Sequence, residues 1–202
     1  TIGKKDIFLC DSGGQYKYGT TDVTRTICFS KQSQDIKNIF TKVLKGHIAV
    51  ATSNLKKDNI GKKIDIRARK FLKKSNLDYA HGTGHGVGFF LNVHEGPQSI
   101  SKINKVKIKE GMILSNEPGF YKKNKFGIRI ENLVYVKKQN KKLFFENLTM
   151  APIEKDMINF VCQIFFNKTT RVHTIEKHQR INLLYTFNQT IFKSILQIII
   201  SV

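Results

Sequence analysis

Four carboxylates and one histidine of this chain are of types that could hold divalent metal ions. Each is predicted to lie at the end of a strand, within a strand or in a glycine-rich turn: Asp11, Asp22, His85, Glu117 and Glu131. Oxygen-rich ligand sets with a single imidazole suit ions such as manganese, cobalt or zinc, and a pair of ions needs carboxylates that can bridge them. The set therefore predicts a site for two divalent metal ions.

Each of these residues, taken alone, has an ordinary structural interpretation. An Asp at the end of a strand is usually a turn residue, and a Glu on a strand usually faces solvent. Two of the carboxylates, however, lie among apolar neighbours: Glu117 follows the apolar residues 112–114, and Glu131 follows Ile128 and Ile130. Because a buried carboxylate must be paired or bound to a metal ion, these contexts favour ligands over surface residues.

Three histidines lie close together in the middle of the chain. His81 and His85 belong to the segment HGTGHGVG, whose four glycines let the backbone approach a ligand closely and disfavour a helix. Their spacing is therefore not that of a helical zinc-protease motif. His94-Glu95 cannot begin an HExxH helix either, because Gly96-Pro97 would break the next turn. The pattern excludes a peptidase with a single zinc ion of that class.

The first half of the chain predicts two strands and two helices that position the early ligands. Residues 6–11 (DIFLCD) indicate a short buried strand, and the glycine-rich residues 12–14 indicate a turn after it. A second extended segment runs through residues 23–29. Apolar residues then recur at helical spacing over about 32–53 and again over 64–72, which predicts two amphipathic helices.

The second half predicts three strands. One lies near residues 112–117 and stops at a proline, and the last covers residues 143–149 after a polar turn. Between them, residues 126–136 alternate plainly, with apolar side chains on one face and Arg129 and Glu131 on the other. We therefore expect one continuous strand there, with Glu131 inside it.

The composition of the sequence changes near its end. Glycine and proline vanish after about residue 157, and apolar residues at helical spacing run from 181 to 199. We expect a catalytic domain over residues 1–158 and a divergent helical tail over residues 159–202.

The composition suggests a protein of the cytoplasm. No apolar stretch is long enough to span a membrane, no secretory signal opens the chain, and the three cysteines are scattered, so we expect no membrane partner and a reducing compartment. The net charge of +20 comes almost entirely from dispersed lysines, whereas base readout prefers arginine. A- and T-rich codons specify lysine, so a biased genome would produce this charge without any partner. We therefore expect no specific nucleic-acid partner.

Four segments, in this order, closely resemble eukaryotic aminopeptidase P: DSGGQYKYGTTDVTRT from Asp11, HGTGHGVGFFLNVHEGP from His81, SNEPGFY from Ser115 and FGIRIEN from Phe126. The resemblance covers about residues 6–157. It implies an α+β pita-bread fold of the creatinase/aminopeptidase type, which prolidase and methionine aminopeptidase share, and FGIRIEN speaks against the methionine enzymes.

The resemblance also implies a role for each candidate ligand. Asp11 would hold one ion, His85 and Glu117 would hold the other, and Asp22 and Glu131 would bridge both. The two ions are expected to be manganese. The implied substrate is a peptide with proline in second position, from which the first residue is removed, and the full-length family implies a homodimer.

Further residues take their expected roles from the same resemblance. Water activated by the ions would attack the peptide carbonyl, with Glu117 moving the proton. His94 would stabilise the developing oxyanion, and His81 would help to hold the substrate. Arg129 and Tyr121 would support a ligand carboxylate.

The match to the family has gaps, and other functions stay open. Family members carry two helices, further strands and a substrate-binding histidine before the DSG strand, so we expect a catalytic domain that is incomplete at its N-terminus and possesses little activity by itself. A prolidase, which cleaves Xaa-Pro dipeptides, is the alternative enzyme. A catalytically dead pita-bread domain that serves as an interaction module is the alternative outside enzymes.

Overall fold

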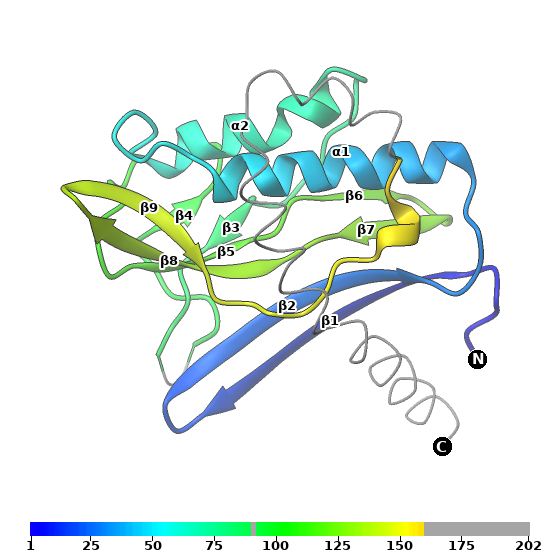
Figure 1. The fold of residues 1–202 in the computed structure, drawn as a ribbon, viewed down its shortest axis with the longest axis horizontal. Helices are drawn as coiled ribbons and strands as arrows, with labels where there is room; N and C mark the ends of the chain where they lie inside the picture. Colours follow the sequence, from blue (N-terminus) through cyan, green and yellow to red (C-terminus); the bar gives the residue numbers. More distant parts are fainter. Residues whose placement is uncertain (90–91, 160–202) are drawn as a thin grey trace.

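The computed structural model describes residues 1–89 and 92–159, and these form helices packed against strands (Figure 1). Two helices, α1 (Gln34–Ala51) and α2 (Gly61–Lys73), pack against each other on one side of the strands. The strands are β1 (Ile7–Tyr16), β2 (Gly19–Cys28), β3 (Gly84–His85), β4 (Ser99–Ile100), β5 (Ile113–Asn116), β6 (Gly119–Lys122), β7 (Phe126–Arg129), β8 (Asn132–Gln139) and β9 (Lys142–Asn147), and a 3₁₀ turn, η1 (Lys155–Met157), follows them. The predicted α+β class is confirmed.

Both predicted helices are present and lie close to their expected bounds. The Ser33 hydroxyl accepts a hydrogen bond from the backbone N–H of Ile36 and so begins α1, whose buried face carries Phe40, Val43 and Val50. Helix α2 buries two charged side chains, Asp65 and Arg69, in addition to its apolar ones. The hydropathy pattern did not predict that pair.

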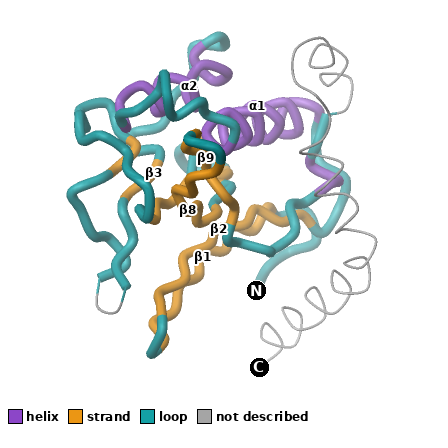
Figure 2. Tube along the Cα trace, turned by 60° about the vertical axis from the view of Figure 1, so that its left-hand side comes forward, coloured by secondary structure: helices purple, strands orange, loops and turns teal. Residues whose placement is uncertain are grey.

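Strands β1 and β2 form one long antiparallel hairpin that extends away from the helices (Figure 2). The turn predicted at residues 12–14 is wrong, because the ladder continues through the glycines and the chain reverses after Tyr16. Glycine is needed here for close pairing, since a Cβ on Gly13 would lie 2.9 Å from the Thr21 carbonyl oxygen. The expected burial of the first strand is also wrong, because its residues are half-buried or exposed.

The strand predicted over residues 126–136 is two strands in different sheets. Strand β7 pairs with β6, whereas β8 lies between β5 and β9. At the break, the N–H of Ile130 donates to the Pro118 carbonyl (3.4 Å) and the N–H of Glu131 donates to the Thr24 carbonyl of β2 (3.1 Å). Glu131 therefore lies between strands rather than within one, which corrects the expected position.

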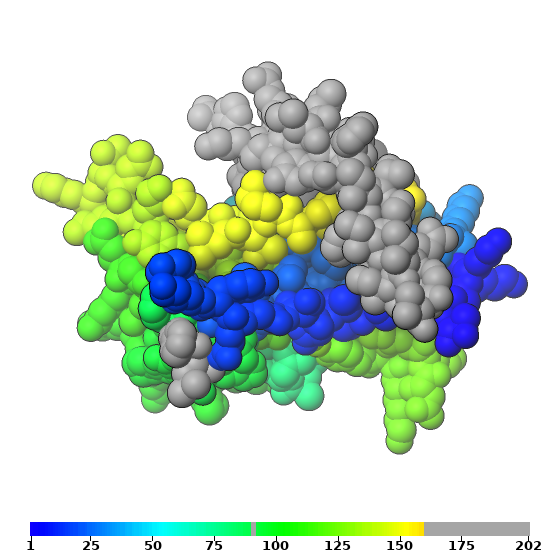
Figure 3. Space-filling model, turned by 90° about the horizontal axis from the view of Figure 1, so that it is seen from below, coloured from blue at the N-terminus to red at the C-terminus, as the bar shows by residue number. Residues whose placement is uncertain are grey.

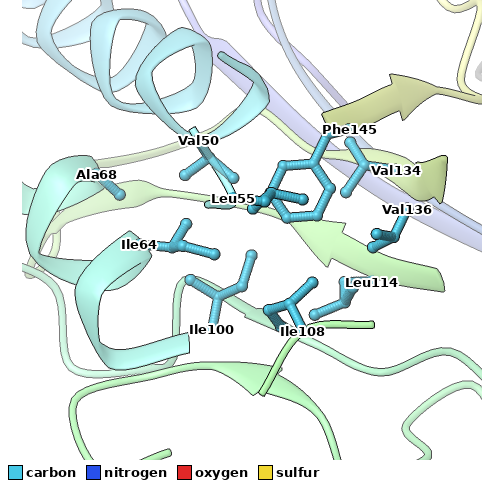
Figure 4. Close-up of a cluster of buried hydrophobic side chains, with 10 residues drawn as sticks. All are labelled: Val50, Leu55, Ile64, Ala68, Ile100, Ile108, Leu114, Val134, Val136 and Phe145. Carbon is cyan, nitrogen blue, oxygen red and sulfur yellow. The ribbon is translucent and has the colours of Figure 1, made fainter. Parts of the chain in front are cut away.

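The apolar side chains form two clusters under the helices. One is centred on β8, β9 and the adjoining ends of both helices (Figure 4): Val50, Leu55, Ile64, Ala68, Ile100, Ile108, Leu114, Val134, Val136 and Phe145. The other joins β2, β7 and η1 to the helices: Cys28, Phe40, Val43, Leu72, Tyr79, Ile128, Ile130 and Met157. The break before β8 therefore divides the expected apolar face, with Ile128 and Ile130 in one cluster and Val134 and Val136 in the other.

The predicted tail over residues 159–202 lies, except for its first residue, outside the described residues. Among the described residues, no helix combines the length and the apolar character needed to cross a membrane.

Candidate metal centre

The hairpin places two carboxylates on one face. Asp11 pairs with Thr24 and Gly13 pairs with Asp22, so all four residues project to the same side of the ladder. The two aspartates are thus diagonal neighbours across the strands, and the missing side chain of Gly13 leaves space beside Asp22. Asp22 is buried, whereas the Asp11 side chain is half exposed.

The next two candidate ligands come from the short strand β3 and the end of β5. The backbone N–H of His85 donates to the Ser115 hydroxyl (2.9 Å), and that hydroxyl donates to Glu117 Oε1 (2.9 Å). The N–H of Glu117 donates to the Thr83 carbonyl (2.8 Å). Ser115 and Thr83 therefore hold the imidazole and the carboxylate at one edge of the cleft.

Glu131 lies deepest of the five, with 2% of its surface exposed. The Thr24 hydroxyl donates to its Oε2 at 2.5 Å. Burial and the negative charge of Glu117 raise the pKa of Glu131 to about 7, with Asp22 and Asp11 adding to the effect and the Thr24 hydrogen bond opposing it.

These five side chains, together with His94, form three groups whose ligand atoms lie within 4.8 Å of one another. Asp22, His85 and Glu131 each belong to two of the groups. The groups are His85, Glu117 and Glu131; Asp11, Asp22 and Glu131; and Asp22, His85 and His94. The first two groups share a carboxylate, which is the arrangement that a bridged pair of ions requires.

The donor chemistry of His85 suits a cation between the carboxylates. Its Nδ1 lies 2.9 Å from the Gly86 carbonyl oxygen, which can only accept, so Nδ1 carries a proton. Its Nε2 then faces Asp22 Oδ2 and Glu117 Oε1, each at 3.3 Å. In a neutral imidazole this nitrogen holds a lone pair, so a proton or a metal ion must lie between it and the two acceptors.

The pKa values of the cluster have the same physical origin. Burial lowers the pKa of His85, but the hydrogen bond to Asp22, the Gly86 carbonyl and the charge of Glu117 outweigh burial, so that the pKa is raised. Burial raises the pKa of Glu117, although His85 and the Ser115 hydroxyl oppose the change. Crowded acids of this kind are stabilised in their ionised form by a cation, so the residues fit a divalent-metal site.

Arg129 connects Tyr121, the other predicted supporting residue, to the carboxylates. Its Nη2 donates to Asp11 Oδ2, its Nε donates to the Thr24 hydroxyl (2.9 Å) and its Nη1 donates to the Tyr121 hydroxyl (2.9 Å). Tyr121 in turn lies 2.9 Å from Nε2 of His81. Arg129 thus reaches Asp11 directly and Glu131 through Thr24.

The two other candidate histidines, His94 and His81, lie in different places. His94 lines the cleft, and its ring centroid lies 3.8 Å from that of His85. His81 is not among the residues that line the cleft, and its Nδ1 donates to the Gly82 carbonyl (2.6 Å). Burial and the charge of Arg129 lower the pKa of His81.

The cleft has a volume of about 720 Å³ and opens beside the β1–β2 hairpin, which crosses one face of the molecule (Figure 3). The hairpin supplies one wall through residues 13–15 and 20–22, and the segment 92–94 supplies another. The candidate ligands Asp11, Asp22, His85, Glu117 and Glu131 all line it.

Sequence reasoning missed two residues that hold the ligands. Thr24 joins Glu131 to Arg129, and its place two residues after Asp22 on a strand was a usable signal. Arg25 is buried and donates to the Glu131 carbonyl (2.5 Å) and the Thr24 carbonyl (2.8 Å). Burial lowers the pKa of Arg25 to about 10. No sequence signal pointed to Arg25, because most of its acceptors are backbone carbonyls, and those of Glu131, Ala151 and Pro152 lie far away in the chain.

Comparison with known proteins relates the chain to metallopeptidases. The model of a family described as metallopeptidase family M24 matches residues 1–138. A curated relative named "Probable Xaa-Pro aminopeptidase P" from Laccaria bicolor is 48% identical over 169 residues, which cover 78% of this chain and 26% of the relative. A protein of the same name from Aspergillus fumigatus is 49% identical, over 75% of this chain and 25% of its own length.

Solved structures agree in fold. The X-prolyl aminopeptidase of Caenorhabditis elegans, described as a cytosolic enzyme with a dinuclear active site, superposes with a TM-score of 0.71 at 40% identity, covering 77% of this chain and 26% of that one. Prolidase from Pyrococcus furiosus has a TM-score of 0.66 at 28% identity, covering 75% and 43%. These matches confirm the pita-bread α+β fold. The chain spans about a quarter of the length of these curated relatives.

Proposed function

The chain belongs to the M24 metallopeptidase family, and from that premise we propose that its cleft holds two divalent metal ions and serves to remove the first residue from peptides with proline in second position. The observation that carries this proposal is the convergence of five metal-ligand side chains on one cleft, in two groups that share Glu131. The names of the relatives supply the peptide class.

The two shared-ligand groups suggest which residues hold which ion. His85 and Glu117 would hold one ion, and Asp11 would hold the other. Glu131 belongs to both groups, and Asp22 Oδ2 lies 3.3 Å from His85 Nε2, so both carboxylates can reach both positions. Four carboxylates and one imidazole form a hard, oxygen-rich set, which favours manganese over softer ions.

When bound, the two ions would polarise the peptide carbonyl and lower the pKa of an attacking water. The chain's own residues would handle protons and charge. Glu117, whose pKa burial raises, can accept a proton at one step and return it to the leaving amine at the next. His94 lies at the cleft beside His85, from which its imidazole can donate to the oxygen that becomes negative.

Arg129 and Tyr121 would act by orientation. The guanidinium donates to Asp11, to Thr24 and to the Tyr121 hydroxyl, so it fixes the exposed aspartate in relation to the buried glutamate. His81 lies at the far end of this chain of hydrogen bonds. A role for His81 in holding substrate requires that a bound peptide extend beyond the residues that line the cleft.

A prolidase is the second candidate, because prolidases share the fold at 28% to 34% identity. Relatives named as X-Pro aminopeptidases range from 32% to 49% identity, and the upper part of this range, which exceeds that of the prolidases, favours the longer substrate. Manganese-dependent release of the first residue from an Xaa-Pro-Xaa tripeptide, without cleavage of an Xaa-Pro dipeptide, would separate the two. Cleavage of the dipeptide alone would favour the prolidase.

Asp22→Asn tests the metal centre itself. A neutral amide cannot offset two cations, so we expect this variant to lose most bound manganese in a metal analysis of the purified full chain. Asp156→Asn, at the exposed η1 turn, is the matched control and should bind as much as the parent. Equal manganese in the Asp22 variant and the parent would contradict a dinuclear site.

The location and assembly of the whole protein extend the same proposal. The Caenorhabditis elegans relative is described as cytosolic, which supports a cytoplasmic location here. A homodimer remains a prediction from the family resemblance, and size-exclusion chromatography with light scattering would test it.

A further inference from the structure

The loop over residues 78–83, which leads into β3, must hold its shape for the cleft to form. It carries His81 directly and leads into His85, yet it has no helix or strand of its own before Gly84. The Thr83 carbonyl of this loop also accepts a hydrogen bond from the N–H of Glu117. The position of this loop therefore affects an imidazole and a carboxylate of the candidate metal centre at once.

The first connection from helix α2 to this loop is a buried guanidinium. Arg69 is 1% exposed, and its Nη1 donates to Asp78 Oδ1 and to the Tyr79 carbonyl, both at 2.7 Å. Its Nη2 donates to the His81 carbonyl at 2.6 Å. The guanidinium also stacks over the Tyr79 ring, 3.9 Å from the centroid. One side chain thus fixes three positions along the loop.

Asp65, one helical turn before Arg69, makes the second connection. It is fully buried, and its Oδ2 accepts from Arg69 Nε (2.8 Å) while its Oδ1 accepts from the Thr83 hydroxyl (2.6 Å). Because the carboxylate can only accept, the Thr83 hydroxyl must donate to it, and the Tyr79 hydroxyl, 2.5 Å away, must donate to Thr83. The side chain of Thr83 is thereby bound to α2 while its carbonyl is bound to Glu117.

Strand β5 holds the opposite side of the loop. A Cβ on Gly84 would lie 2.0 Å from the Ser115 carbonyl oxygen, so the backbones are in close contact there. The N–H of His85 donates to the Ser115 hydroxyl. The loop is therefore fixed between α2 and β5, and the contacts on the α2 side come from Asp65 and Arg69.

We propose that Asp65 and Arg69 are positioning residues of the metal centre, which act through Thr83 to bring His85 and Glu117 together. This inference rests on the proposed function. A buried ion pair is not stabilising in itself, and apolar residues of similar volume can replace such pairs without loss of stability. Apolar residues cannot, however, donate to two carboxylates and two backbone carbonyls in fixed directions, which the planar guanidinium does.

The test uses a matched pair at Thr83 in the full chain. Thr83→Val keeps the shape of the side chain but removes the hydroxyl, whereas Thr83→Ser keeps the hydroxyl. We expect Thr83→Val to weaken manganese binding, measured by calorimetric titration, by about ten- to a hundredfold, and Thr83→Ser to restore it to within a few fold of the parent. Titrations are made at a temperature at which circular dichroism shows each variant to be folded.

Val136→Ala separates positioning from general loss of stability. Val136 belongs to the apolar cluster centred on β8 and β9 and does not line the cleft. This variant should therefore lower the thermal midpoint but leave manganese affinity unchanged. If Val136→Ala weakens manganese binding as much as Thr83→Val does, or if Thr83→Val binds as tightly as the parent, the proposal is wrong.

A second readout needs no metal ion. In the metal-free chain, the imidazole NMR signals of His81 and His85 should shift or broaden in Thr83→Val but not in Thr83→Ser, while the signal of His47 stays in place. If the parent binds no manganese but the signals behave in this way, the proposed metal centre is wrong, whereas the role of Asp65 and Arg69 in positioning the loop through Thr83 stands. Unchanged His81 and His85 signals would overturn the positioning role.

Discussion

Glu131 is the residue in which burial and charge act most strongly together. Its carboxylate is 2% exposed, accepts a hydrogen bond from Thr24 and lies near three other carboxylates. Burial and the charge of Glu117 raise its pKa to about 7, so a metal-free chain keeps a proton there across the mildly acidic range. A divalent cation would favour the ionised form instead.

The metal-free chain should lose stability as pH rises from about 4.5 to about 7. In this window Glu131 loses its proton in the unfolded chain but keeps it in the folded one, and each unit of pKa difference is worth about 1.4 kcal/mol. Glu131→Gln lacks this component, so its urea midpoint should fall less over the same window. Glu146→Gln, on β9, is the control and should follow the parent.

Manganese should reverse the trend, because the cation stabilises the ionised carboxylate. A parent whose stability falls no more than that of Glu131→Gln over this window would show that Glu131 does not titrate in this way.

Arg129→Lys should weaken manganese binding by about tenfold with little change in the thermal midpoint of the metal-free chain. A lysine ammonium is a point charge and cannot donate at once to Asp11, Thr24 and Tyr121 as the guanidinium does. Arg67→Lys is the matched control, since Arg67 forms a surface ion pair with Asp58 at 3.2 Å. Equal affinities in both variants would argue against a positioning role for Arg129.

Among the elements, the short strand β3 depends on close backbone contact with β5. Gly84→Ala would place a Cβ 2.0 Å from the Ser115 carbonyl oxygen, so β3 and β5 would have to separate. We expect a loss of about 1 to 3 kcal/mol in stability and weaker manganese binding, because His85 moves with the strand. Chemical denaturation and metal titration measure the two effects.

Gly19→Ala is the control for this substitution. A Cβ at Gly19 would meet no atom within 4 Å, so the variant should keep both the stability and the metal affinity of the parent. If the Gly84 variant behaved like the Gly19 variant, the close contact of β3 with β5 would not matter for the centre.

At the scale of the whole molecule, the helices cover two apolar clusters, and the carboxylates lie on the hairpin and at the strand ends. The net charge of +20 comes mainly from lysines dispersed along the sequence, whereas the carboxylates make the lining of the cleft acidic. Dispersed lysines bind phosphates through counterion release without reading bases.

Any affinity of the chain for DNA should therefore be weak, independent of sequence and lost as salt rises. Fluorescence anisotropy with two unrelated duplexes, at about 50 and 200 mM salt, measures this, and the higher salt should reduce the affinity by orders of magnitude. A duplex preference that survives at the higher salt would mean that the basic surface has a specific partner.

Local sequence pattern was sufficient to predict much of the molecule. Helical spacing over residues 32–53 and 64–72 predicted α1 and α2, because one apolar face per helix must be buried whatever the rest of the fold is. The proline after Glu117 and the polar turn at residues 139–142 predicted where β5 ends and β9 begins. The carboxylates and histidine of the candidate site could be named because their chemistry is a property of residue type.

Contacts between distant segments decided the rest. The glycines after Asp11 continue β1 rather than end it, because they lie opposite Thr21 and Asp22 of the partner strand. Residues 126–136 alternate as one strand would, yet they divide before Asn132 because the N–H of Glu131 finds its acceptor on β2. Arg25 and Arg69 hold backbone carbonyls that lie up to 127 positions away in the chain. Hydrogen bonds of this kind leave no periodic signal, since any residue can supply a carbonyl, so they become visible only when the chain is folded.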